Sequence, residues 1–220
     1  MYDRLYGLFG EDKLNILADK KILLVGVGGV GSGVFEVLIR SGIKNITIID
    51  FDTYEKSNLN RQLNSLEDVI GKKKVEVMKK HAKMINPSIN VIALDEYLKE
   101  DSDIDLKEFD FIIDACDSVN AKAMLIEKAF ANNVRIITSL GVGNRVNPTQ
   151  FTITKLDKVT SDPLGKKLRN YLKKANFNEE VIVLASKEVP IKSNPVSSYI
   201  AVSLTAGILI ADYVIKELLK

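Results

Sequence analysis

A glycine-rich stretch, Gly26–Ser32, is the first group of residues whose types and spacing could do chemistry. Its sequence is GVGGVGS, and Gly26, Gly28 and Gly31 fit the G-x-G-x-x-G pattern. In that pattern the first glycine permits a tight turn, the second lets the backbone approach phosphate, and the third lets a helix pack closely on a strand. Backbone N–H groups at a helix start attract anions. The stretch therefore predicts a nucleotide-phosphate site, without specifying the nucleotide.

Polar and charged residues that follow the glycines indicate which nucleotide is bound. Asp50 and Asp52 end an apolar run 24 residues after Gly26, where a carboxylate can accept hydrogen bonds from ribose hydroxyls. Basic and amide side chains come next and could surround a triphosphate, with arginine as a bidentate fork and lysine as a point charge. They are Asn58, Arg61, Gln62 and Lys74. A pyrophosphate carries fewer charges and is largely served by helix N–H groups, so this cluster favours ATP over NAD.

The segment Asp114–Asp117, with the sequence DACD, ends another apolar run. Carboxylates there would lie at the edge where open α/β sheets bind ligands, and Asp117 is the predicted ligand of Mg²⁺. Asp114 either shares that role or caps the following turn, and the sequence leaves both open. Cys116 could be a thiol nucleophile, but its place after an apolar strand favours a buried, inert side chain. The single histidine, His81, is predicted to face solvent on a lysine-rich helix, which leaves little for a Cys-His or Ser-His-Asp mechanism.

Strand-like apolar runs alternate with amphipathic segments along most of the chain. The runs are 22–25, 46–49, 90–94, 111–113 and 134–138. This alternation predicts an α/β fold with a Rossmann-like, doubly wound and mainly parallel sheet. Gly42 is predicted to end one helix, and Asn86-Pro87 to end the helix over 74–84. Beyond Pro148 we expect two antiparallel strands, 150–155 and 181–186, around a basic helix over 163–175, followed by a terminal helix.

The composition fits one domain of 220 residues with 46% hydrophobic content. We expect a nucleotide-binding part over 1–150 and a basic part over 151–220 that contacts substrate and a partner subunit. One cysteine excludes an intramolecular disulfide and a multi-cysteine zinc site, and the start of the chain lacks a signal-peptide pattern, so a cytoplasmic protein is expected. The apolar segment 199–215 is interrupted by polar residues, which favours a buried or dimer-facing helix over stable membrane insertion.

Charge is unevenly distributed along the chain. Residues 141–220 carry 12 Lys/Arg against 7 Asp/Glu, whereas residues 1–140 carry 19 against 22. The basic residues crowd into the predicted helix over 163–175, as a nucleic-acid contact would require. A solvated helix face is the commoner meaning of a charge run taken alone.

Five motifs taken together, in order, resemble the adenylating enzymes of the ThiF/MoeB/HesA superfamily, relatives of the ubiquitin-activating enzymes. The motifs are Gly26–Ser32, Asp50–Asp52, Ser57–Gln62, Lys74 and Asp114–Asp117. The resemblance implies a homodimer that uses ATP and Mg²⁺, joins a carboxylate to AMP and releases pyrophosphate. It assigns Gly29 and Asp50 to ATP, and Asn58, Arg61 and Lys74 to its phosphates. It assigns Asp117 to Mg²⁺ and makes Arg4 the arginine that reaches the neighbouring subunit's site.

Residues outside the shared site resemble one branch of that superfamily, the tRNA threonylcarbamoyladenosine dehydratases. They are Arg40–Ile43, Asp114–Val119, Gly141–Thr149, Asp162–Leu164, Leu168–Arg169 and Ser186–Glu188. The resemblance implies that ATP activates the threonyl carboxylate of threonylcarbamoyladenosine beside the tRNA anticodon, and that an internal nitrogen displaces AMP to close a ring. Candidate tRNA contacts are Arg145, Lys166, Lys167, Arg169, Lys173 and Lys174. A sulfur-transfer protein is a further candidate partner.

Two alternatives stay open at this point. The first is an activator of a ubiquitin-like sulfur carrier in the molybdopterin or thiamine pathway, which the absence of paired Cys-x-x-Cys zinc motifs disfavours. The second is an NAD-binding regulatory module, which rests only on Gly26–Gly31 and Asp50. The segment between Glu188 and Ser198 is shorter than in longer dehydratases, so we expect a trimmed substrate-covering loop.

Overall fold

The computed structural model describes residues 2–99, 102 and 104–220, and its centre is a seven-stranded sheet in the order β3-β2-β1-β4-β5-β7-β6. The strands are β1 Lys21–Val25, β2 Asn45–Ile49, β3 Asn90–Leu94, β4 Phe111–Asp114, β5 Arg135–Ser139, β6 Phe151–Lys155 and β7 Ile182–Ser186. The pairs from β3 to β7 are parallel, which confirms the Rossmann-like prediction. The expected antiparallel pairing of the last two strands is also confirmed, and only β6 runs against the sheet because β7 pairs parallel to β5.

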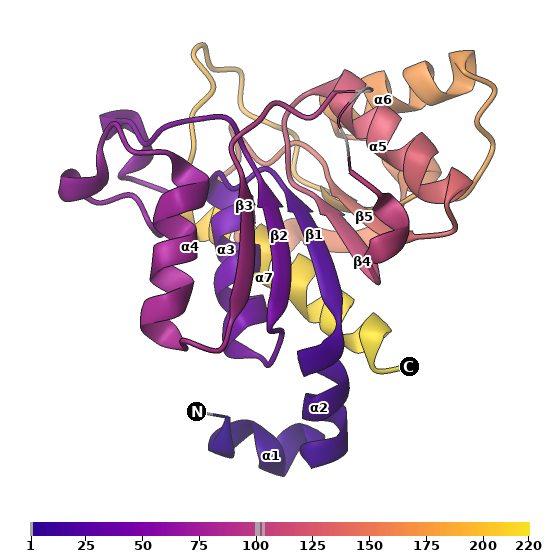
Figure 1. Ribbon diagram of the computed structural model, residues 1–220. Coiled ribbons are helices and arrows are strands. Elements are labelled where there is room, and N and C mark those ends of the chain that lie inside the picture. The colour runs from indigo at the N-terminus through magenta and orange to yellow at the C-terminus, as the bar shows by residue number, and fades with distance from the viewer. Residues whose placement is uncertain (1, 100–101, 103) are drawn as a thin grey trace.

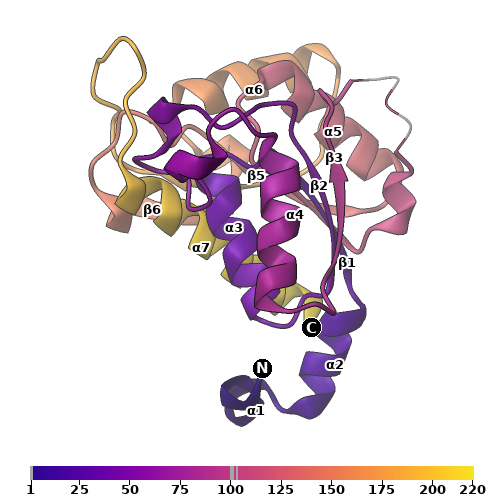
Figure 2. The same ribbon diagram turned by 60° about the vertical axis from the view of Figure 1, so that its left-hand side comes forward.

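Helices cover both faces of this sheet (Figures 1 and 2). They are α1 Asp3–Phe9, α2 Glu11–Asp19, α3 Gly29–Arg40, α4 Lys74–Ile85, α5 Val119–Ala131, α6 Pro163–Lys174 and α7 Ile200–Leu218. Alternate residues of β1 point to opposite faces: Ile22 and Leu24 join the core under α3, α4 and α7, and Leu23 and Val25 join the core under α5 and α6. This two-sided burial explains why the parallel strands are continuously apolar in sequence.

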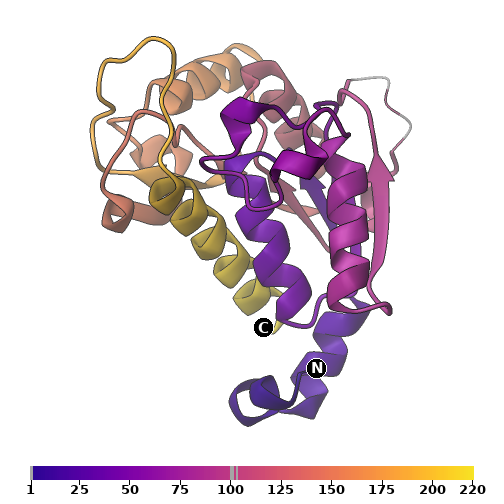
Figure 3. The ribbon, with the colours of Figure 1, turned by 90° about the vertical axis from the view of Figure 1, so that its left-hand side faces the viewer.

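The apolar C-terminal segment forms α7, which packs along α3 (Figure 3). The two helices approach closely at glycines: a Cβ on Gly207 would lie 2.5 Å from the Val30 carbonyl oxygen and 3.0 Å from Gly33 Cα. The expectation of a buried helix is therefore confirmed. Among the residues that the structure describes, no helix combines the length and apolar character needed to cross a membrane.

Two predicted helix ends are also confirmed. Helix α3 ends at Arg40, and Gly42 follows with a φ of 113°, in the left-handed region that favours glycine. Helix α4 ends at Ile85 with Asn86 as its C-cap, immediately before Pro87.

The sequence analysis was incomplete about His81 on α4. Its Nε2 atom lies 2.7 Å from Glu36 Oε2 of α3, and its side chain is 31% exposed. Glu36 also accepts a hydrogen bond from Arg40 Nε at 2.5 Å. His81 therefore joins two helices instead of simply facing solvent, because the lysine-rich face of α4 meets an acidic residue of α3.

Candidate active site

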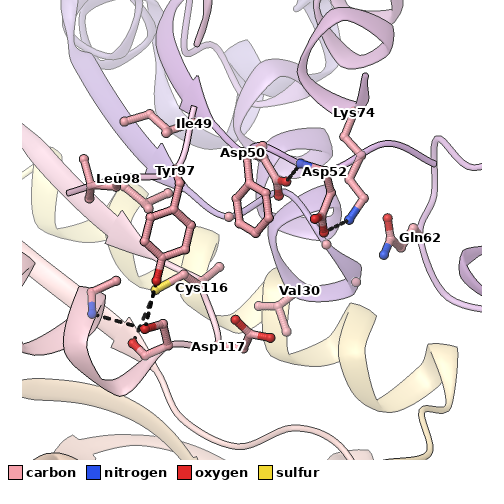
Figure 4. Close-up of a pocket in the computed structure, with 18 of the residues that line it drawn as sticks. Val30, Ile49, Asp50, Asp52, Gln62, Lys74, Tyr97, Leu98, Cys116 and Asp117 are labelled. Carbon is pink, nitrogen blue, oxygen red and sulfur yellow. Dashed lines mark hydrogen bonds and ion pairs between the residues drawn. The ribbon is translucent and has the colours of Figure 1, made fainter. Parts of the chain in front are cut away.

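A cavity of about 440 Å³ opens at the carboxyl ends of β1, β2 and β4 (Figure 4). The strand order reverses here, because β2 lies on one side of β1 and β4 on the other. Open α/β sheets bind ligands at this kind of switch point. The segments that line the cavity are the glycine turn, the end of β2, the loop over 58–62, the start of α4, residues 96–98 and the turn after β4.

The glycine turn forms one wall of the cavity and the start of α3. Gly26 has a φ of 86°, and a Cβ there would lie 2.8 Å from backbone atoms of Ala115 and Cys116. A Cβ on Gly31 would overlap the Gly26 carbonyl oxygen. Gly28 and Gly29, at the first positions of α3, line the cavity without covering it by side chains. Each glycine therefore has the steric role that its spacing predicted, and the backbone N–H groups of α3 can approach an anion.

Asp50 holds the glycine turn against the end of β2. Its Oδ2 accepts a hydrogen bond from the Val27 N–H at 2.8 Å, and its Oδ1 accepts one from the Asp52 N–H at 2.9 Å. Carboxylate oxygens have further lone pairs, so these bonds leave acceptor capacity for a ribose hydroxyl. Asp50 also lines the cavity, so the structure combines a turn-forming role with a position suited to ribose.

Cationic and amide side chains gather at the other side of the glycine turn. Lys74, at the first position of α4, is 4% exposed, and its Nζ lies 2.7 Å from Asp52 Oδ2. Asn58 and Gln62 are buried, and within the described residues Gln62 Oε1 has no hydrogen-bond partner. Arg61 Nη1 donates to the Ser57 carbonyl oxygen at 2.5 Å and stays partly exposed. The predicted phosphate-binding residues are thus brought to one cavity wall, with an unpaired amide among them.

The turn after β4 carries Asp117 into the cavity, where its side chain is exposed (Figure 4). Ser118 caps α5 by accepting a hydrogen bond from the Ala121 N–H, and also receives one from the Tyr97 hydroxyl at 3.3 Å. In the described part of the chain no ion pair involves Asp117. Three or more metal-binding side chains do not cluster anywhere among the described residues.

Asp114 is the structural acid of the two roles left open by the sequence. It is fully buried, and Lys122 Nζ lies 3.1 and 3.2 Å from its two carboxylate oxygens. Its Oδ1 also accepts hydrogen bonds from the backbone N–H and the thiol of Cys116, at 3.1 and 3.0 Å. These bonds fix the turn that presents Asp117.

The environment of Cys116 favours the thiol over the thiolate. Burial and the neighbouring charge of Asp114 raise the pKa of the Cys116 thiol well above its ordinary range. A thiolate is the reactive nucleophile, so this side chain is poorly suited to a thioester relay. The interpretation of an inert cysteine is supported, although Cys116 does line the cavity.

Lys122 and Tyr97 were missed by sequence reasoning. Lys122 is a lone cation between Ala121 and Ala123 on a helix that faces the core, and it is fully buried. A lysine on an apolar helix face is a signal for a buried acidic partner, and a strand-end aspartate was available. Tyr97 stands on a loop without a periodic pattern, and only the fold brings its hydroxyl to Ser118.

Several other predicted site residues lie outside this cavity. Arg4 is exposed on α1, which projects from the end of the sheet opposite the cavity (Figures 1 and 3). Four candidate tRNA contacts are exposed on α6: Lys166, Lys167, Lys173 and Lys174. Arg169 is half-buried and donates hydrogen bonds to the carbonyl oxygens of Leu156 and Val159.

Arg145 requires a correction. Its side chain is 1% exposed and is held by Asp162 Oδ2 at 2.7 Å and by the Gly141 carbonyl oxygen at 2.8 Å. A buried guanidinium paired in this way cannot contact RNA at the surface. Its loop position suggested an exposed cation, but a distant aspartate that also caps α6 buries it instead.

The model of the ThiF family matches residues 2–220. The chain belongs to the ThiF family. A relative of this ThiF chain, the tRNA threonylcarbamoyladenosine dehydratase of Haemophilus influenzae, is 40% identical over 185 residues, which are 81% of this chain and 71% of that protein. The dehydratase of the same name from Bacillus subtilis is 32% identical, covering 96% and 91% of the two chains. The crystal structure of the Escherichia coli dehydratase in complex with ATP aligns with a TM-score of 0.92 at 33% identity, over 99% and 93% of the chains.

Proposed function

We propose that this ThiF family chain is an ATP-dependent tRNA-modifying dehydratase. It transfers AMP from ATP to the threonyl carboxylate of threonylcarbamoyladenosine and closes a ring with release of AMP. The observation that carries the proposal is the convergence of the glycine turn, Lys74, Arg61 and Asp117 on one cavity. Relatives and a solved structure that carry the dehydratase name, one of them bound to ATP, support the choice of reaction.

The chemistry needs charge neutralisation more than a base. A carboxylate oxygen of the substrate attacks the α-phosphorus of ATP, the bond to the β-phosphate breaks, and pyrophosphate leaves with the electron pair. Lys74 and Arg61 are placed to stabilise negative charge on the phosphates, which is the largest contribution in such reactions. A nitrogen of the substrate then attacks the activated carbonyl carbon and AMP leaves. No step calls on Cys116 or His81.

Asp117 is the proposed ligand of Mg²⁺. Magnesium usually keeps several waters and takes only one or two carboxylates together with substrate phosphates, so a single exposed carboxylate beside the phosphate wall fits it. The unpaired Gln62 amide adds a polar group for the same ligands. When bound, the ion neutralises phosphate charge.

The proposed assembly is a cytoplasmic homodimer acting on tRNA, with Arg4 of each subunit reaching the other subunit's cavity. A sulfur-transfer protein is retained as a further proposed partner. The exposed lysines of α6 support a contact with a polyanion, because together they form a basic helix face.

The test combines purified protein, ATP, Mg²⁺ and tRNA that carries threonylcarbamoyladenosine. We expect AMP and pyrophosphate to be released and the modified nucleoside to lose the mass of one water. Arg61→Ala and Lys74→Ala should each reduce AMP formation by about a hundredfold or more, while the melting temperature stays close to that of the wild type. Lys80→Ala, an exposed lysine of α4 outside the cavity, is the matched control and should keep full activity.

Two outcomes would contradict the proposal. Adenylation of the C-terminal glycine of a carrier protein, with tRNA ignored, would identify a sulfur-carrier activator. A melting temperature raised by NAD and not by ATP would identify a dinucleotide-binding module, because a ligand stabilises only the state that binds it.

A further inference from the structure

Beside the cavity, two loops expose a set of apolar side chains, which we call the loop platform. It consists of Val146, Val189, Ile191, Val196 and Tyr199, which are 58%, 73%, 53%, 71% and 52% exposed. Single exposed apolar residues are ordinary, but five from two neighbouring loops form a patch, and such patches mark interaction sites.

Hydrogen bonds hold the two loops together, so the exposure does not result from a lack of anchoring. Asn144, at a φ of 60°, donates its backbone N–H to the Ser197 carbonyl oxygen at 2.8 Å and accepts from the Ser197 N–H through Oδ1 at 2.6 Å. Its carbonyl oxygen accepts from the Ile191 N–H at 2.7 Å. The Glu188 carboxylate accepts from the N–H groups of Val146 and Asn147 at 3.0 Å each. The apolar side chains are therefore presented on a fixed scaffold.

The platform borders both the cavity and the basic helix α6. The Asn60 side chain, next to Arg61, donates to the Ser198 carbonyl oxygen at 3.0 Å. On the other side, Ser161 at the entry to α6 donates from its hydroxyl to the Ser186 carbonyl oxygen at 3.0 Å. Figures 1 to 3 show the 187–199 loop, in gold, standing at the carboxyl edge of the sheet. A molecule on the platform could thus reach the phosphate wall of the cavity and α6 at once.

The charge of the platform favours an anionic occupant. Lys187 and Lys192 are exposed, and Glu188 is the only acidic residue in 141–150 and 186–199. Its carboxylate already accepts two backbone hydrogen bonds. Apolar side chains next to cations suit single-stranded nucleic acid, whose unstacked bases have apolar faces and whose backbone is negative.

We propose that the loop platform receives unstacked bases of the tRNA anticodon loop and so places the modified adenosine over the cavity. This inference rests on the proposed function and adds a division of labour to it. The platform binds bases, whereas α6, with Lys187 and Lys192, binds phosphates. The two surfaces should therefore differ in how salt affects their contributions to affinity.

The test uses the full chain and a synthetic anticodon stem-loop containing threonylcarbamoyladenosine, with affinity measured over a range of salt concentrations. The variant Val189→Ser with Ile191→Ser should bind about tenfold more weakly, and the slope of affinity against salt should stay unchanged. Lys187→Gln with Lys192→Gln should reduce the magnitude of that slope by about one. Met84→Ser and Lys80→Gln change matched exposed residues on α4, at 76% exposure for Met84, and should behave as the wild type.

Photo-crosslinking of a thio-uridine in the anticodon loop gives a second readout that needs no variant, and the crosslinked peptide should fall within 186–199 or 141–150. Wild-type affinity in the serine variant, or crosslinks confined to other segments, would overturn the platform while leaving the proposed function intact. A serine variant with a changed oligomeric state would make the platform a subunit contact and also overturn it. If the wild type neither binds nor converts the RNA, the proposed function fails, and the inference with it.

Discussion

At the residue scale, the buried pair of Asp114 and Lys122 links the core to the reaction. Both side chains are fully buried, and Asp114 bonds the turn that carries Asp117. Buried ion pairs gain little net stability over apolar pairs, but losing one partner leaves a buried charge without compensation. The pair therefore fixes the position of a functional carboxylate at the risk of a fragile core.

We expect Lys122→Met to lower the free energy of unfolding by about 3–5 kcal/mol, because it leaves the Asp114 carboxylate unpaired. The double variant Asp114→Asn with Lys122→Met should lose clearly less than the sum of the two single changes, since neither charge remains. Urea unfolding followed by linear extrapolation measures all three. Strictly additive losses would mean that the two side chains do not interact in the folded protein.

At the element scale, an acidic residue joins α3 to α4. Burial disfavours the ionised form of Glu36, but hydrogen bonds from His81 and Arg40 and their charges outweigh it, so the pKa of Glu36 lies below its ordinary value. A carboxyl group with a lowered pKa in the folded state stabilises the fold above its ordinary pKa, and this contribution is lost as the pH falls through the folded-state pKa.

Glu36→Gln should therefore destabilise the protein at neutral pH by on the order of 1 kcal/mol or less, because the group is partly exposed and screened by solvent. The difference from the wild type should shrink as the pH falls below the ordinary range of a glutamate. Thermal or urea unfolding at a series of pH values checks this, and a difference that grows toward acid would contradict the assigned ion pairs.

The contact between α7 and α3 gives a second prediction at this scale. Gly207→Ala should destabilise the protein by about 1–3 kcal/mol, because the new methyl group would lie 2.5 Å from the Val30 carbonyl oxygen and force the helices apart. Gly7→Ala in α1 is the matched control, since nothing lies within 4 Å of its added methyl group. Alanine is the better helix former, so that control should be neutral or slightly stabilising. Equal effects of the two changes on the melting temperature would refute the close packing.

At the scale of the whole molecule, the N-terminal helices α1 and α2 extend away from the cavity (Figures 1 and 3). Arg4 lies on this arm and belongs to the end of the sheet opposite the carboxyl edge. A role for Arg4 in catalysis therefore requires a second copy of the chain.

This geometry makes a complementation experiment decisive. Arg4→Ala and Lys74→Ala should each abolish most AMP formation when assayed alone. Mixing them under conditions that exchange subunits should restore activity, because a mixed dimer has one cavity with both Lys74 and a partner's arginine. A mixture as inactive as its components, with exchange demonstrated, would show that Arg4 does not act across subunits.

The sequence by itself determined the framework and much of the cavity. Short apolar runs, glycine spacing and strand-end acids depend on local backbone geometry, so the strands, the helix ends and the positions of Gly26 to Gly31, Asp50 and Lys74 could be read without tertiary contacts. The parallel pairing of β7 with β5, the burial of Arg145 and Lys122, and the contact of His81 with Glu36 depended on partners 17, 8 and 45 residues away for the three side chains. Only the tertiary structure decided these, because a charged side chain looks the same in sequence whether it meets water or a distant counter-ion, and folding alone brings that counter-ion within reach.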